Sequence, residues 1–415
     1  MLCLFGLYII SDTGRFDLGR NGRRKREDMY NFDEIIDRRG KNSAKWDDRF
    51  IGTGKEELLP FWVADTDFPA PKEVQEALRV CVEHNLYGYS LPPKGCAGAV
   101  AKWQKKRHGF LVKEEWVEFT AGIDSALSAA VCAFTQPGEG ILIQTPVYSP
   151  FFETIEQNGR KVLENPMIIK DGKYVPDFDD FEKKAESARV WMFCNPQNPT
   201  GRCFTKEELE RFAGICLKND VLMVSDEIHG DIVFDGRIHI PMASLSDKIC
   251  AKTVTCTSPS KTFSVAGLAA SAIIIGDEKL RNRFREEKEK RCINTGIPGL
   301  TAMEAAYTFG DGYADELLSY LQKNRDYALN YFKERIPKIH AFVPEGTFLL
   351  WLDCTSLMLS GRQLETFFTS SGVKLSMGSA YKDKTETYAR MNFACPKALL
   401  KEGLSRIEKG VLRQI

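Results

Sequence analysis

Residues 258–263 read Ser-Pro-Ser-Lys-Thr-Phe and set one lysine, Lys261, among small hydroxyl side chains. Apolar stretches flank this hexapeptide, with Thr-Val-Thr-Cys at 253–256 and Ala-Ala-Ser-Ala-Ile-Ile-Ile at 269–275. Short apolar runs next to turn residues are typical of buried strands, so we expect the hexapeptide to be a loop between two strands. Burial favours the neutral form of a lysine, which is a nucleophile and can condense with an aldehyde.

Two further polar motifs also follow short apolar runs. Asn-Pro-Gln-Asn-Pro-Thr-Gly at 195–201 follows the run 190–193, and Asp226-Glu227 follows the run 221–224. In open α/β sheets, ligands bind outside the carboxyl ends of the strands. We therefore expect an amide, a carboxylate and an amine to meet in one pocket.

These three groups suit pyridoxal phosphate. Its aldehyde requires a lysine, and its ring nitrogen stays protonated only beside a carboxylate, so Lys261 and Asp226 are the candidates for these two roles. Asn198 could hydrogen-bond the ring hydroxyl. Tyr148, in the turn after the apolar run 140–143, could stack on the ring face.

The cofactor phosphate has candidate contacts at two places in the sequence. Ser258 and Ser260 lie just before the lysine and offer hydroxyl groups. Gly122 and Ile123 precede a helical pattern through Ala133 and could offer backbone amides at a helix N-terminus. The neighbouring Asp124 would repel a phosphate unless its carboxylate turns away to cap that helix.

Taken together, the motifs resemble those of the fold-type I pyridoxal-phosphate enzymes, and within them the MalY/PatB-type cystathionine β-lyases, or C-S lyases, of the class I/II aminotransferase superfamily. The resemblance runs from about Met29 to the C-terminus. It implies an α/β fold, the PLP-dependent transferase fold, in which a large domain with a central, mostly parallel sheet is joined to a smaller α/β domain. Seven ordered segments carry the resemblance: 31–40, 62–68, 87–90, 195–201, 225–229, 258–263 and 390–396.

The resemblance also implies roles for individual residues. Lys261 matches the lysine that attaches to the cofactor and then acts as general base on Cα, and Asp226 matches the partner of the ring nitrogen. Arg390 matches the arginine that receives the substrate α-carboxylate, a task suited to a planar guanidinium. Tyr89 matches a tyrosine that crosses a dimer interface to contact the cofactor and serve catalysis in the neighbouring active site, which implies a homodimer.

Three residues complete the expected contacts. Asn198 is expected on the ring hydroxyl and near the substrate, and His229 on the ring or phosphate side. A metal role for His229 is not expected, because no HExxH motif or paired histidine accompanies it. The stretch 62–68 is expected to form one wall of the substrate pocket, with Val63 as a contact.

The implied reaction is β-elimination, in which L-cystathionine or a related cysteine S-conjugate is cleaved to a thiol, pyruvate and ammonia. Many aminotransferase relatives carry an arginine eight residues after the lysine, whereas this chain has Ala269, and that difference favours the lyase branch. An aminotransferase is the alternative, since the same groups can transfer the amino group instead. A lyase-fold protein with an additional regulatory binding role is a third reading.

The composition fits a soluble, cytoplasmic enzyme, and the resemblance implies a small sulfur amino acid as its substrate. Its 415 residues include 57 basic and 57 acidic side chains, a balance that gives no electrostatic footprint for nucleic acid or an anionic membrane. The 12 cysteines are scattered without a CxxC pair, which indicates reduced cysteines and no metal site.

The expected organisation has four parts. Residues 1–28 are expected to be a disordered extension or the product of an upstream start, and residues 29–60 an arm that contributes to the small domain. The large cofactor-binding domain is expected at 61–297. The small C-terminal domain, at 298–415, is expected to contain a long helical stretch through Tyr331, a strand at 347–352, a helix at 361–370 and a strand ending at Arg390.

Overall fold

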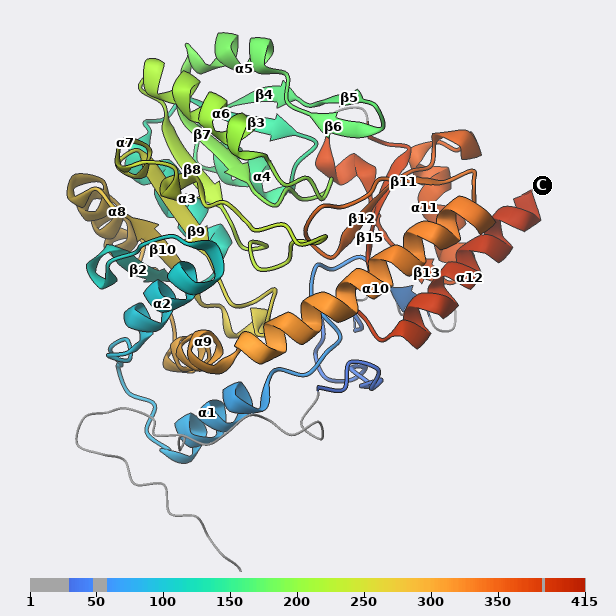
Figure 1. The fold of residues 1–415 in the computed structure, drawn as a ribbon, viewed down its shortest axis with the longest axis horizontal. Helices are drawn as coiled ribbons and strands as arrows, with labels where there is room; N and C mark the ends of the chain where they lie inside the picture. The colour runs from blue at the N-terminus through green and yellow to red at the C-terminus, as the bar shows by residue number, and fades with distance from the viewer. Residues whose placement is uncertain (1–29, 48–57, 383–384, 415) are drawn as a thin grey trace, which may run out of the picture.

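The computed structural model describes residues 30–47, 58–382 and 385–414, so the expected extension at 1–28 lies outside the described residues. A seven-stranded sheet forms the centre of the larger part of the molecule (Figure 1). Only β10 runs antiparallel to its neighbours, and the other pairs are parallel. In spatial order the strands are β2 (Val117–Thr120), β10 (Ser271–Ile275), β9 (Thr253–Thr257), β8 (Leu222–Asp226), β7 (Ala188–Cys194), β3 (Gly140–Thr145) and β4 (Lys161–Pro166).

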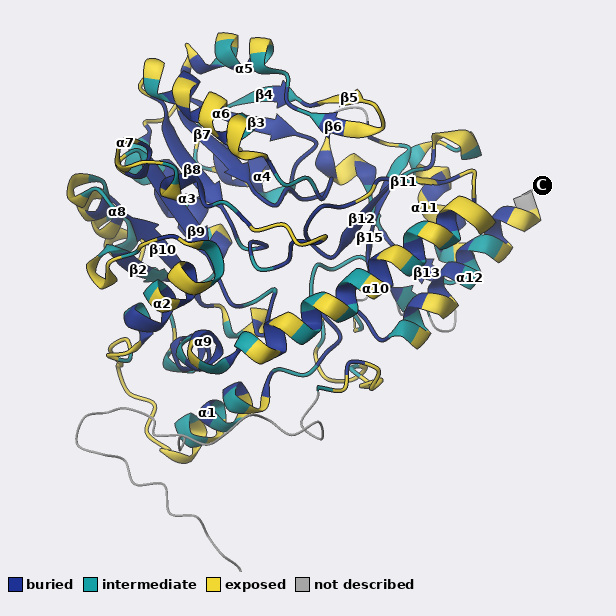
Figure 2. Cartoon of the chain, in the orientation of Figure 1, coloured by how far each residue is buried: buried dark blue, intermediate teal, exposed yellow. Residues whose placement is uncertain are grey.

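Helices cover both faces of this sheet, and Figure 2 shows its strands mostly buried. Alternate strand residues face opposite sides, as in Ile141 and Ile143 on one face and Leu142 on the other. The first face packs against α3 (Ile123–Phe134), α4 (Pro150–Gln157) and α8 (Glu278–Lys290). The second packs against α5 (Phe178–Ala185), α6 (Lys206–Lys218) and α7 (Asp247–Cys250).

A second, four-stranded sheet lies with the C-terminal helices on the right of Figure 1. Its order is β11 (His340–Ala341), β12 (Leu349–Asp353), β15 (Tyr388–Asn392) and β14 (Ser376–Met377). The helices of this part are α10 (Asp311–Arg335), α11 (Gly361–Ser370) and α12 (Lys397–Gln414). Two small pairings complete the strands: β1 (Leu59–Pro60) with β13 (Val373–Lys374), and β5 (Ile168–Lys170) with β6 (Lys173–Val175).

The helical stretch expected beyond Pro298 is interrupted. It consists of α9 (Ile297–Phe309) and α10, which meet at Gly310. A β-carbon at Gly310 would collide with the ring of Phe263 and with the Ala306 carbonyl, so this position, where the loop of Lys261 packs against the helices, requires glycine. The expected helix at 361–370 is confirmed, and the expected strands near 347–352 and Arg390 are β12 and β15.

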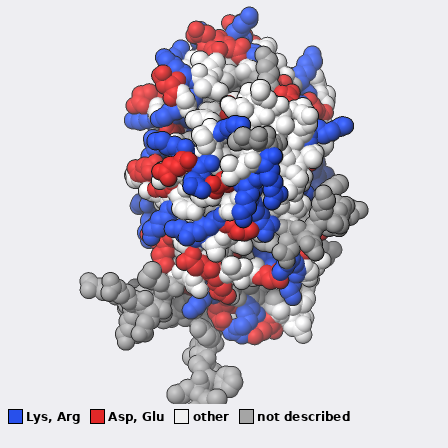
Figure 3. Space-filling view, turned by 90° about the vertical axis from the view of Figure 1, so that its right-hand side faces the viewer, with Lys and Arg blue, Asp and Glu red and all other residues white. Residues whose placement is uncertain are grey.

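The proposed boundary at residue 298 stays a prediction. The helix α9 packs against α1 (Lys72–Glu83) and α2 (Cys96–His108), whereas β1 of the arm pairs with β13 of the C-terminal part. Within the described ranges, no helix is both long and apolar enough to cross a membrane. Figure 3 shows acidic and basic side chains interspersed on one face of the molecule.

Candidate active site

The loop of Lys261 joins β9 to β10, as expected. The Ser258 hydroxyl donates to the Ala270 carbonyl at 2.7 Å and accepts from the Ser260 amide at 3.2 Å, which ties the loop to the start of β10. Lys261 Nζ donates to the carbonyl oxygen of Ala64 at 2.8 Å. Burial, and then the charge of Arg390, lower the pKa of Lys261 and so favour its neutral amine.

The predicted residues converge on one cavity of about 410 Å³ at the carboxyl ends of β7, β8 and β9. The convergence follows from topology, since parallel strands bring their carboxyl ends to the same edge. The cavity is lined by all the expected site residues of one chain: Val63, Gly122, Ile123, Tyr148, Asn198, Asp226, His229, Ser258, Ser260, Lys261 and Arg390. Their roles in binding stay predictions.

Asp226 is buried at the end of β8, where its Oδ1 accepts from the Ile228 amide at 3.1 Å. Burial raises the pKa of Asp226 to about 7, with a smaller contribution from Asp124, while the Ile228 amide opposes the rise. A cation beside Asp226 would restore the charged carboxylate. The site is therefore suited to a group that carries a proton.

The raised pKa of Asp226 predicts a stability change in cofactor-free protein. In the folded protein, Asp226 keeps its proton up to about pH 7, whereas in the unfolded chain the pKa of this group is near 3.8. Between these two pKa values the unfolded chain ionises and the folded protein does not, so the native protein loses stability as pH rises. We expect the free energy of unfolding of Asp226→Asn to rise, relative to that of the native protein, by about 1.4 kcal/mol per pH unit from pH 5 to pH 7. Urea unfolding at each pH measures this gap.

The exposed carboxylate of Asp179 provides the matched control. For Asp179→Asn, the gap to the native protein should stay constant over the same range. A constant gap for Asp226→Asn as well would contradict the raised pKa.

Arg390 projects from β15 and is braced on two sides. Its Nη1 donates to Asn198 Oδ1 at 3.0 Å and its Nη2 to the Trp62 carbonyl at 2.6 Å. Its buried Nε has no hydrogen-bond partner among the described residues. Because the Oδ1 of Asn198 accepts a hydrogen bond from Arg390, the NH₂ group of Asn198 is the part available to donate to an oxygen such as that of a ring hydroxyl.

Gly122 and Ile123 also line the cavity, and α3 begins after Gly122, whose φ of 88° suits glycine. The N-cap position is Gly122, and no hydrogen bond influences the pKa of Asp124, so the condition that its carboxylate caps the helix is not met. Asp124 instead lines the cavity, and burial raises its pKa. The Ser258 hydroxyl already donates to Ala270, so its predicted phosphate contact requires that hydroxyl to turn.

Two aromatic groups complete the walls. His229 is buried, and burial lowers its pKa well below the usual value, so its ring is neutral. Its Nδ1 has no partner within the described part of the chain. Tyr148 is held by its amide, which donates to the Asn198 carbonyl at 3.0 Å, and burial raises the pKa of its phenol.

Tyr89 differs from the other predicted residues. It is fully exposed in the segment between α1 and α2 and does not line the cavity of its own chain. The described residues contain no group of three histidine, cysteine or acidic side chains arranged to hold a metal.

Sequence reasoning missed Ser376 and Tyr381. Both line the cavity, their hydroxyl groups lie 2.8 Å apart, and the Tyr381 ring centre is 5.4 Å from the Arg390 guanidinium. They reach the site because Ser376 pairs with Arg390 across the antiparallel strands β14 and β15. That pairing is a long-range contact without a local motif.

Comparisons with known proteins show which families and structures this chain is similar to. The family model "Aminotransferase class I and II" matches residues 65–407. Cystathionine beta-lyase PatB of Bacillus subtilis is 42% identical over 386 residues, covering 91% of this chain and 99% of the relative.

Two solved structures resemble the fold closely. A PLP-bound putative aminotransferase from Clostridium difficile matches with a TM-score of 0.90 and 37% identity, covering 92% of this chain and 100% of that chain. Cystalysin from Treponema denticola, which contains pyridoxal 5'-phosphate, matches with a TM-score of 0.89 and 33% identity, covering 93% and 99%.

Proposed function

The chain belongs to the class I and II aminotransferase family, and we propose that it is a pyridoxal-phosphate-dependent carbon–sulfur β-lyase. Its substrates would be L-cystathionine or related cysteine S-conjugates, cleaved to a thiol, pyruvate and ammonia. The expected MalY/PatB resemblance and the expected fold are confirmed by the matches to PatB and to the C. difficile structure. The identity to PatB along nearly the whole chain is the observation that favours a lyase.

The cavity fits the cofactor. The amine of Lys261 and the carboxylate of Asp226 lie in its lining, and buried His229 Nδ1 and Arg390 Nε still have capacity for hydrogen bonds. Lys261 would hold the aldehyde carbon, Asp226 the ring nitrogen and the start of α3 the phosphate. When bound, pyridoxal phosphate supplies an aldehyde for amines and a ring that takes up the electron pair left on Cα.

The protein's own groups account for the remaining steps. Arg390 presents a guanidinium to the substrate α-carboxylate and fixes the orientation of the amino acid. The neutral amine of Lys261, favoured by its lowered pKa, can accept the proton from Cα. A thiolate on Cβ then leaves with the electron pair of the C–S bond, and the remaining three-carbon fragment is hydrolysed to pyruvate and ammonia.

The runner-up is an aminotransferase, as the name of the C. difficile structure illustrates. The absorption spectrum separates the two. An aminotransferase should accumulate the pyridoxamine form of its cofactor with an amino acid and recover with a 2-oxo acid. We expect the native protein instead to keep its spectrum through many turnovers and to release thiol and pyruvate in equal amounts.

We further propose a homodimer in which Tyr89 reaches the partner's cavity. Support comes from its exposure, shared with Leu86, Tyr87 and Leu91 in the same segment. Isolated apolar residues are normal on a surface, whereas four within six positions suggest a covered face. We also propose a cytosolic enzyme, since the cysteines of the described residues are all free.

The dimer predicts complementation. Tyr89→Ala and Lys261→Ala chains are each expected to be nearly inactive, but a hybrid dimer contains one cavity with both native residues. Half of randomly paired dimers are hybrids with one intact site of two, so co-expressed chains should regain about one quarter of native activity. Separately purified variants, mixed without subunit exchange, are the control. Co-expressed chains with no such gain would contradict a role across the interface.

A regulatory binding role is a separate possibility from catalysis. Any such role that does not depend on turnover should survive Lys261→Ala, whereas pyruvate release should not. A regulatory activity that disappears with Lys261→Ala would belong to the catalytic site.

A further inference from the structure

The segment from Trp62 to Thr66 is held by side chains from elsewhere in the chain. It lies outside helices and strands, yet each of its five consecutive carbonyls accepts a side-chain hydrogen bond. The Trp62 carbonyl accepts from Arg390 at 2.6 Å and the Ala64 carbonyl from Lys261 at 2.8 Å. One short stretch of backbone thus contacts both the expected substrate arginine and the expected catalytic lysine.

Asn392 braces the middle of this segment. Its Nδ2 donates to the Val63 carbonyl at 2.7 Å and to the Asp65 carbonyl at 2.6 Å, on either side of Ala64. Asn392 lies two residues after Arg390 on β15, so the brace and the arginine share one strand. The Ala64 carbonyl therefore has little freedom to rotate away from Lys261.

The N-terminal arm holds the other side of the segment through ion pairs. Arg38 Nη2 contacts Asp65 Oδ2 at 2.6 Å, and Arg38 Nη1 contacts Asp67 Oδ1 at 2.7 Å and the Thr66 carbonyl at 3.2 Å. Lys45, only 1% exposed, contacts Asp67 Oδ2 at 2.7 Å. Charge-assisted contacts at such distances fix geometry strongly where water is excluded.

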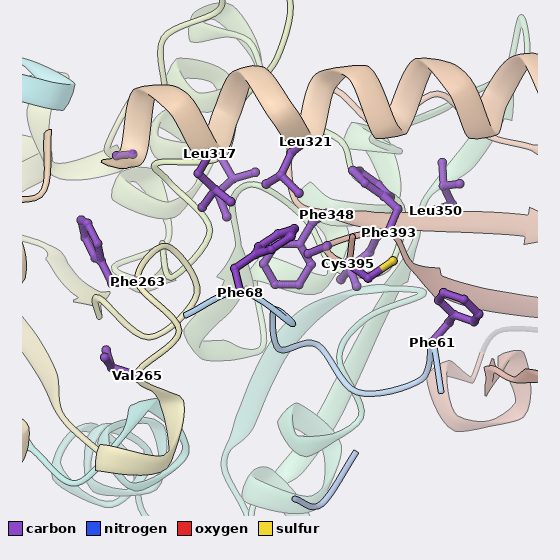
Figure 4. Packing of buried hydrophobic residues seen from close by; sticks show 14 of the residues in the cluster. Phe61, Phe68, Phe263, Val265, Leu317, Leu321, Phe348, Leu350, Phe393 and Cys395 are labelled. Carbon is purple, nitrogen blue, oxygen red and sulfur yellow. The ribbon is translucent and has the colours of Figure 1, made fainter. Parts of the chain in front are cut away.

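Hydrophobic anchors flank the ion pairs. Phe61 and Phe68, at the two ends of the segment, belong to the buried cluster under α10 (Figure 4). Phe68 packs edge-on against Phe32 of the arm, with ring centres 5.1 Å apart. The arm and the segment therefore pack together, and Arg38 and Lys45 of the arm lie against the segment that contains Ala64.

We propose that Arg38 and Lys45 are positioning residues, which hold Asp65 and Asp67 and thereby keep the Ala64 carbonyl at Lys261 Nζ and the Trp62 carbonyl at Arg390. The proposal rests on the proposed function for its catalytic consequence. While the substrate occupies the cofactor's aldehyde, Lys261 is a free amine, and the Ala64 carbonyl would keep it directed into the cavity. Small displacements of a reacting group reduce rates strongly.

The matched test compares Arg38→Met with Arg39→Met. Arg39 is the next residue of the arm, but it is exposed and pairs with Asp37 rather than with the segment. We expect Arg38→Met to lower kcat for pyruvate release by at least about tenfold, and Arg39→Met to stay within about twofold of native. Arg38→Lys, which keeps the charge, should recover part of the loss.

A second readout does not depend on turnover. Covalent capture of pyridoxal phosphate by cofactor-free protein, followed by absorbance against pH, reports the amine of Lys261. The charged groups that act on this amine are Arg390, Asp226, Asp65 and Asp124, so release of Asp65 from Arg38 should alter its titration. We expect the midpoint of capture to move to higher pH in Arg38→Met, because Asp65 raises the pKa of Lys261 and loses its cationic partner, and not to move in Arg39→Met.

Should Arg38→Met fail to fold, Asp65→Asn removes the ion pairs of Asp65 with Arg38 and Lys45, keeps those of Asp67, and undergoes the same two measurements. Capture profiles and kcat values equal to those of Arg39→Met would overturn the proposal. If the native protein releases no pyruvate, the proposed function fails, but the capture profile still decides whether the arm positions Lys261.

Discussion

Replacing Lys261 with alanine is expected to lower pyruvate release from cysteine S-conjugates by about 10⁴-fold or more. The substitution removes the amine that holds the cofactor and, in the proposed function, the base that takes the Cα proton, a role that alone contributes 10²- to 10⁴-fold. Among the described residues, no other lysine lines the cavity to replace it. Pyruvate can be followed continuously by a coupled assay at saturating pyridoxal phosphate.

Borohydride reduction of the holoenzyme should also leave the cofactor's mass on the peptide containing Lys261. The control is Lys252→Ala, which removes a partly exposed lysine at the other end of β9, where it pairs with Asp220. Lys252→Ala should keep both native turnover and the modified peptide. Retention of more than about one hundredth of native turnover by Lys261→Ala would rule out this lysine as the base.

Replacing Arg390 with alanine is expected to lower kcat/KM by about 200- to 5,000-fold. Loss of one partner from a buried charged contact costs roughly 3–5 kcal/mol, which corresponds to a change of this size. The α-carboxylate would lose its bidentate partner, and the Trp62 carbonyl and Asn198 Oδ1 would lose their donor. The kcat/KM of Arg390→Lys, which keeps the charge without the planar guanidinium, should lie between the values of the native protein and Arg390→Ala.

The same variant predicts a pH effect. Arg390 lowers the pKa of Lys261, which is a free amine only in the substrate complex, so removal of Arg390 should raise that pKa and move the acid limb of the kcat profile to higher pH. Arg335→Ala, which removes an exposed arginine paired with Glu408, is the control and should change neither quantity. An unchanged KM and pH profile for Arg390→Ala would contradict its contact with the substrate.

The central part of the site can be predicted from the sequence because the order and direction of the strands determine which residues lie there. Asn198, Asp226 and Lys261 each follow a buried strand, and neighbouring parallel strands bring such positions together without any need for side-chain detail. The long-range contacts were harder to predict. Ser376 and Tyr381 reach the cavity only through pairing of β14 with β15, for which no short motif exists.

The local errors have similar causes. The position between α9 and α10 requires glycine, because a distant ring, that of Phe263, occupies the space of a side chain. Asp124 does not cap α3 but faces the cavity, where Lys261 opposes the effect of burial on its pKa. The role of Tyr89 stays a prediction, since its expected cavity belongs to a second copy of the chain.

The most direct test of the lyase is pyruvate release from L-cystathionine by purified protein with pyridoxal phosphate and without any 2-oxo acid. The proposed function predicts continuous release of pyruvate, ammonia and thiol in equal amounts. Bound cofactor with no pyruvate, together with turnover that begins only when a 2-oxo acid is added, would contradict it and identify an aminotransferase.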